Sequence, residues 1–200
     1  MELDMDPLIL TDSVRYTHLF SVALGIGASF LADSLVLTNL TRPVEQSLLD
    51  RLHHYHRLVW LALIAMWISG AAMVYIRTGF VLENFSPKLY SKLAVVSMLT
   101  LNALLIGRFA MPVVRRNLGR TLLDMPMRRK LPFAWIAAVS STSWLIALAM
   151  GESKVLAASG WSVFVYLVPL AYLGSLLIAS LVTVSLHLRG AGMSTIAAAE

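Results

Sequence analysis

Five long stretches of the chain consist mainly of apolar residues, and short polar or proline-containing segments separate them. Each stretch is close to or above the roughly 20 residues that an α-helix needs to cross a bilayer. We therefore predict an all-α integral membrane bundle of five transmembrane helices, which forms one domain over residues 1–200. The predicted helices cover about residues 14–40, 52–76, 88–113, 132–150 and 161–188.

Proline and glycine mark most of the predicted helix ends. Pro43 ends the first helix, because proline disfavours a helical conformation in the residue before it. Gly79 ends the second helix, and Pro132 is predicted to begin the fourth. Residues 151–160 are predicted to form a loop, and the small residues after Arg189 are predicted to be frayed.

The first predicted helix has one face of small and polar residues along an otherwise apolar surface. At about 100° per residue, Gly25, Ser29 and Asp33 lie within roughly 60° of His18. His18 is near one end of the span, and Asp33 is near the other. Because a titratable side chain in a membrane span is costly, both residues become candidates for function.

The amino-acid composition is typical of a protein that is embedded in a membrane. Hydrophobic residues make up 58 % of the chain and charged residues 14 %, and a soluble fold cannot bury so large an apolar share. The chain has no cysteine, which excludes disulfides, thiolate metal sites and cysteine nucleophiles. Glu2, Asp4 and Asp6 stand where a signal peptide carries positive charge, so we expect no such peptide.

The net charge of +5 comes from lysines and arginines that flank the apolar spans. This placement is typical of membrane topology signals, so we expect the lipid bilayer and not nucleic acid as the partner. Most of the 16 basic residues, including the run at 115–130, lie on one side if the chain starts outside. We therefore predict that the N-terminus is outside and the C-terminus is cytoplasmic.

The predicted topology sorts the titratable residues into two groups at opposite depths. The outer group pairs His18 with Lys92. The inner group has donor atoms suited to heme b or to a divalent or transition metal, since imidazole binds iron, copper and zinc. No established metal motif such as His-Glu-x-x-His is present. The inner group consists of Asp33, His53, His56 and His187.

Simpler explanations stay open for these residues. Histidines at a helix end often lie solvated in the headgroup zone, which applies to His53, His56 and His187. The spacing Gly25-x-x-x-Ser29 is also typical of tight helix packing or of a dimer face. Asp33 is the hardest to explain in this way, because a carboxylate at that depth needs a partner or a proton.

Two short segments resemble a group of bacterial multi-helix membrane proteins. They are residues 16–20 (Tyr-Thr-His-Leu-Phe) and residues 92–96 (Lys-Leu-Ala-Val-Val), the latter followed by Leu-Asn-Ala at 101–103. The group includes the copper-resistance D-type proteins and the membrane protoporphyrinogen oxidase of heme synthesis, and the resemblance covers roughly the first 115 residues. It implies a heme b held by His18 and Lys92.

Three functions are therefore compatible with the sequence. The first is a heme b protein of the bacterial inner membrane that transfers electrons or handles heme or metal, with heme-dependent oxidoreductase as the enzyme class. The second is a proton- or cation-coupled transporter or channel that uses Asp33 and the inner histidines. The third is an assembly or scaffold subunit that binds a second copy or a partner in a membrane complex.

Overall fold

The structure is a computed structural model that describes the backbone of residues 7–197 and the side chains of residues 8–156 and 158–188. The described part is helical without a β-strand, and five of its helices are long and apolar enough to span a membrane. The predicted five-span, all-α membrane fold is confirmed. The elements are α1 (Pro7–Thr38), α2 (Gln46–Thr78), η1 (Leu82–Asn84), α3 (Pro87–Leu105), η2 (Ile106–Ala110), α4 (Met111–Arg116), α5 (Met127–Glu152), α6 (Lys154–Ala158) and α7 (Trp161–Ala197).

Several predicted helix boundaries are wrong by one or more turns. Helix α5 begins at Met127, because Pro132 removes only one backbone donor and stays within the helix. The predicted loop at 151–160 contains α6, whose first turn is capped by the Ser153 hydroxyl accepting from the Leu156 N–H. Helix α7 continues to Ala197, past the predicted end at Leu188.

The third span is interrupted where the sequence predicted one regular helix. A π-helical turn at Ile106–Ala110 joins α3 to α4. Pro112 follows this turn at the start of α4. A proline ring clashes with the carbonyl group four residues earlier in a regular helix, and the wider π turn relieves such a clash. The span therefore changes register beside α2, where Gly107 approaches His56.

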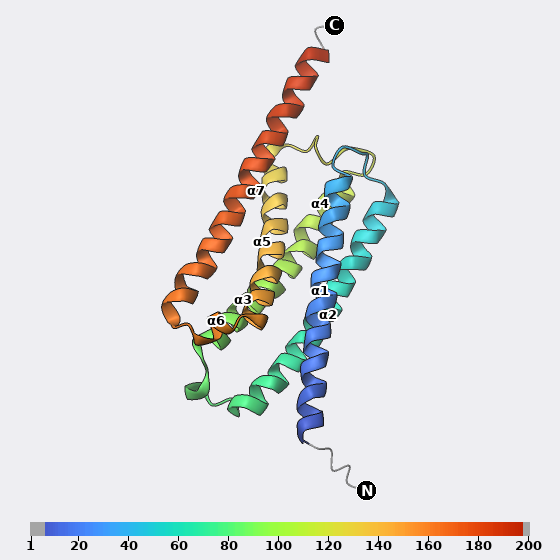
Figure 1. Cartoon of the computed structure of the whole chain (residues 1–200). Coiled ribbons are helices and arrows are strands. Elements are labelled where there is room, and N and C mark those ends of the chain that lie inside the picture. The colour runs from blue at the N-terminus through green and yellow to red at the C-terminus, as the bar shows by residue number, and fades with distance from the viewer. Residues whose placement is uncertain (1–6, 198–200) are drawn as a thin grey trace.

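The helices form two groups that meet near the middle of the bundle (Figure 1). Helices α1 and α2 lie side by side and antiparallel, whereas α5 packs against α3 and α7. Helix α1 also contacts α5, which joins the two groups. Helix α1 begins at one end of the bundle and α7 reaches the opposite end, as an odd number of spans requires.

The centre of the bundle is closed by one aromatic residue. Trp144 of α5 is 0 % exposed and packs with Ala28 of α1, Leu63 of α2 and Leu99 of α3. Helix α7, in contrast, leaves most of its leucines exposed, as expected for a helix at the lipid-facing edge of a bundle. Helix α7 still supplies one partner to the interior, because its Tyr172 hydroxyl lies 2.8 Å from the hydroxyl of the fully buried Ser143 on α5.

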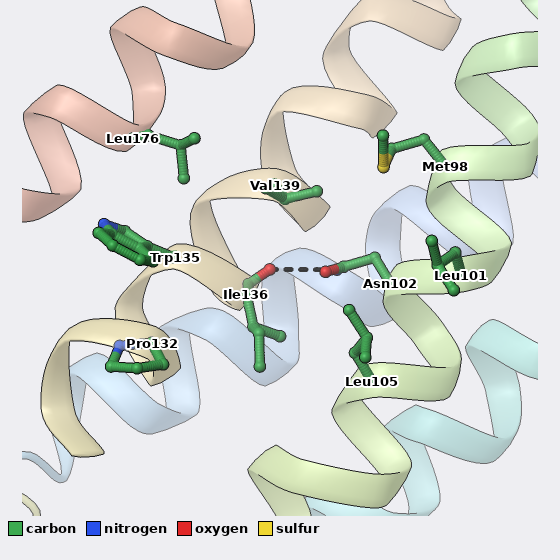
Figure 2. Close-up of a pocket in the computed structure, with 9 residues that line it drawn as sticks. All are labelled: Met98, Leu101, Asn102, Leu105, Pro132, Trp135, Ile136, Val139 and Leu176. Carbon is green, nitrogen blue, oxygen red and sulfur yellow. Dashed lines mark hydrogen bonds between the residues drawn. The ribbon is translucent and has the colours of Figure 1, made fainter. Parts of the chain in front are cut away.

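A groove of about 300 Å³ separates α3 from α5 and α7 (Figure 2). Its lining is apolar except for Asn102, which is 2 % exposed. The Asn102 amide donates to the Ile136 carbonyl oxygen on α5 at 3.1 Å. This hydrogen bond ties α3 to α5, and the groove contains none of the predicted site residues.

Candidate functional site

His18 of α1 faces α2, where its ring meets Ser69. The His18 Nδ1 and Ser69 Oγ atoms are 3.0 Å apart. The Ser69 hydroxyl donates its only hydrogen to the Ala65 carbonyl oxygen at 2.6 Å. Ser69 therefore accepts from His18 in the tautomer in which Nδ1 bears the ring proton, and in that tautomer the lone pair is on Nε2. The Met66 backbone is a further hydrogen-bond partner of the His18 ring. A neighbour that fixes the tautomer in this way is typical of metal-binding histidines.

The surroundings of His18 are compact on one side and positively charged on another. A Cβ atom on Gly70 would lie 3.4 Å from the His18 Cε1 atom, so α2 packs directly against the ring. Lys92 of α3 lies within electrostatic range of His18. Arg77 and Lys88 are within the same range of Lys92, with Glu152 as the acidic neighbour. We call His18, Ser69 and Lys92 the His18 site.

Asp33 lies at the other end of α1 and faces α5. The Ser141 hydroxyl donates to the Asp33 Oδ2 atom at 2.7 Å. One turn earlier on α1, the Ser29 and Ser140 hydroxyls are 3.1 Å apart, and both residues are buried. These two contacts form a line of polar groups between the helices. We call Ser29, Asp33, Ser140 and Ser141 the α1–α5 seam.

The seam ends against Trp144, one turn beyond Ser140 on α5. Its indole ring fills the space above Gly25, where a Cβ atom would come within 2.6 Å of the ring carbon Cζ2. The Trp144 Nε1 atom is fully buried and has no hydrogen-bond partner among the described residues. The small face of α1 thus serves to admit a large aromatic residue from α5.

The inner histidines have separate local partners. The His53 Nδ1 atom donates to the Leu49 carbonyl oxygen at 2.9 Å, within α2 itself. The His56 Nε2 atom accepts from Trp60 Nε1 at 3.1 Å, so this lone pair is already in use. A Cβ atom on Gly107 would lie 3.1 Å from the same nitrogen, so the π turn covers it.

His187, the last of the inner histidines, is exposed on α7. Its Nδ1 atom is 3.5 Å from the Nζ atom of the buried Lys130, which donates to the Leu123 carbonyl oxygen at 2.6 Å. Among the described side chains, no three His, Cys, Asp or Glu residues come together. The structure thus holds Asp33, His53, His56 and His187 in different contacts, and an inner metal site stays a prediction.

Sequence reasoning missed Ser69 and Trp144. The adjacent Ser69 and Gly70 in the middle of α2 are a weak signal, because a small polar pair in an apolar span favours close contact with a neighbour. Trp144 follows Ser140 by one helical turn, which places the indole on the polar face of α5. Neither pattern says which helix lies opposite.

No protein-family model, curated protein or solved structure matches the chain. The resemblance to the copper-resistance D-type proteins and the protoporphyrinogen oxidase therefore rests on residues 16–20, 92–96 and 101–103 alone. What the protein does must be argued from the His18 site and the α1–α5 seam.

Proposed function

We propose that this protein is a membrane-embedded heme b protein that transfers electrons or handles heme in the bacterial inner membrane. The observation that carries the proposal is the hydrogen bond between His18 Nδ1 and Ser69 Oγ. In the tautomer with the proton on Nδ1, this bond directs the Nε2 lone pair away from Ser69, where it would bind a metal ion. A homodimer or a partner subunit stays a prediction, as does an oxidoreductase activity.

The side chains around His18 support this proposal. His18 offers an oriented imidazole nitrogen, and Lys92 supplies the second contact that the resemblance implies. The Arg77 and Lys88 side chains, which are near Lys92, would provide positive charge for the heme carboxylates, and Lys88 also donates to the Ser153 carbonyl oxygen. Among the histidines, His56 is unsuited to this role because Trp60 already occupies its Nε2 atom.

Bound heme would supply a one-electron iron couple within the membrane, tuned by its ligands and its burial. The chain's own residues would do the rest. His18 would hold the heme, and Ser69 fixes the orientation of its imidazole ring. Because Ser69 is itself tied to the Ala65 carbonyl group, the ring is held by α2 and not by α1 alone.

The test is the visible spectrum of the full chain, purified after expression with heme supplied in excess. We expect a Soret band, and a reduced-minus-oxidised difference spectrum typical of a b-type heme. The H18A variant should lose the Soret band. The matched control is H54A, because His54 is exposed on α2 and its ring packs edge-on against the adjacent Tyr55.

Two results would reject the proposal. One is the absence of a Soret band in the native chain. The other is an equal Soret band in the native and H18A proteins, each shown by circular dichroism to be folded. Loss of the band in both H18A and H54A, with intact helix content, would also count against a specific role for His18.

A further inference from the structure

The half-buried carboxyl group of Asp33 has a neutral hydrogen-bond partner among the residues that the structure describes. Asp33 lies five residues before the end of α1, which is about 8 Å at 1.5 Å per residue and therefore within the span. Its hydrogen-bond partner is the Ser141 hydroxyl of α5. Among the described residues of α2 and α5, the helices packed against α1, no lysine, arginine or histidine forms an ion pair or hydrogen bond with it.

A carboxyl group in such surroundings is suited to binding a proton. Ser141 donates to the Oδ2 atom, which leaves the Oδ1 atom as the place where a proton can form an O–H bond. A metal ion fits less well, because the Ser29 and Ser140 hydroxyls are bonded to each other at 3.1 Å. A bare cation would need most of these oxygens at once.

A second observation concerns Trp144, which packs against Gly25 of α1 and follows Ser140 by one helical turn on α5. The Trp144 indole N–H is fully buried and lacks an acceptor among the described residues. Buried polar groups in proteins almost always have a partner, and an internal water is the usual one when protein atoms are absent. Trp144 lies one turn from Ser140, so such a water would extend the line of seam hydroxyls.

We infer that the α1–α5 seam is a proton-binding site, in which Asp33 takes up and releases a proton and an internal water accepts from Trp144. Uptake forms the Oδ1–H bond on the carboxylate, and release returns the proton to water. The step needs no oxidant or reductant. This site is separate from the His18 site, and it does not depend on the proposed heme.

Infrared difference spectroscopy between acidic and alkaline pH tests the site in the full chain, reconstituted in lipid nanodiscs. We expect a C=O stretching band of a protonated carboxyl group that D33N removes. In S141A the band should persist at higher frequency, because the carboxyl group loses a hydrogen bond. The matched control is D50N, since Asp50 is exposed on α2 and accepts from Gln46.

The infrared experiment has outcomes that would contradict the proposal. If D50N removes the same band as D33N, or if D33N removes no band, the assignment of the proton to Asp33 is wrong. D33E guards against a folding defect, because a folded glutamate variant should restore a titrating band at shifted frequency. A folded D33E protein without that band would also overturn the proposal.

The internal water has its own measurement. Exchange of the tryptophan indole N–H groups with D2O can be followed by nuclear magnetic resonance, with W144F used to assign the Trp144 signal. We expect fast exchange at Trp144 and slower exchange at Trp60, whose N–H is bonded to His56 within the protein. Equal or greater protection at Trp144 would show that the seam is dry, and that part of the inference would fail.

Discussion

The two titratable residues of α1 that face neighbouring helices are each held by a serine, and the two serines act in opposite ways. Ser69 of α2 accepts from His18, whereas Ser141 of α5 donates to Asp33. In the tautomer with the proton on Nδ1, the His18 ring has a lone pair on Nε2, and the Asp33 Oδ1 atom has no hydrogen bond among the described residues. One end of α1 is thus suited to a metal ion and the other to a proton.

The difference comes from the helix that carries each serine. The Ser69 hydrogen is used by the Ala65 carbonyl oxygen one turn earlier on α2. Ser141 donates across the helix interface to Asp33. The same residue type therefore becomes an acceptor or a donor according to where its own hydrogen is directed.

The largest expected effect is a loss of stability when the packing of Trp144 against α1 is disturbed. In G25V the new side chain would overlap the Trp144 ring and separate α1 from α5. We expect a loss of about 1–3 kcal/mol or more in the free energy of unfolding, which is the usual cost of overpacking. Thermal or denaturant unfolding in detergent measures it.

The matched control for G25V is G27V, because a Cβ atom on Gly27 has no atom within 4 Å. Both variants place the same β-branched residue in the same helix, so their difference isolates the collision with Trp144. Equal losses of stability would show that the Trp144 side chain can move aside at little cost. The small residue at position 25 would then not be needed for the packing of α1 against α5.

The second effect concerns the His18 end. In S69A the His18 Nδ1 atom loses its acceptor, and loss of such an orienting partner typically weakens metal binding by about 10- to 100-fold. Heme titration followed at the Soret band should show this loss, and S69T should largely restore binding. The carboxyl infrared band of Asp33 should be unchanged in S69A. A change in that band would show that the His18 and Asp33 ends of α1 influence each other.

A smaller effect is expected from the corresponding serine substitution at the Asp33 end of α1. S141A removes the donor to Asp33, and interhelical hydrogen bonds in membranes contribute on average about 0.6 kcal/mol to stability. Unfolding measurements should show a loss of that size, and heme titration should give the native affinity. A weakened heme affinity in S141A would contradict the separation of the two sites.

The smallest effect on the two sites should come from an interhelical bond that belongs to neither end. In N102A the α3–α5 hydrogen bond to the Ile136 carbonyl group is lost (Figure 2). We expect a stability loss similar to that of S141A, about 0.6 kcal/mol, with no change in the Soret or carboxyl bands. Changes in both bands would mean that S69A and S141A report general loosening of the bundle.

Pattern reading located the spans but not every irregularity within them. The face of the third span that carries Val95, Leu99 and Asn102 is buried, as its helical spacing predicts. The π turn at Ile106–Ala110 was missed, because hydrophobic periodicity barely registers one extra residue in a turn. Pro112 was the available signal.

The candidate site was predictable only in part. The sequence placed His53 and His56 on one face of α2, yet one bonds to its own backbone and the other to Trp60. Spacing along one helix says which residues share a face. It does not say whether a ring nitrogen is still free after the neighbours have packed.

The sequence by itself determined that this chain has five membrane-length helices, and that α1 has polar groups on one face. The reason is that bilayer thickness and helical periodicity act on each segment separately. Only the tertiary structure decided that His18 meets Ser69, that Asp33 meets Ser141, and that Trp144 closes the centre. Those pairings depend on which helices become neighbours, and a hydrogen bond acts only over the last few ångströms between them.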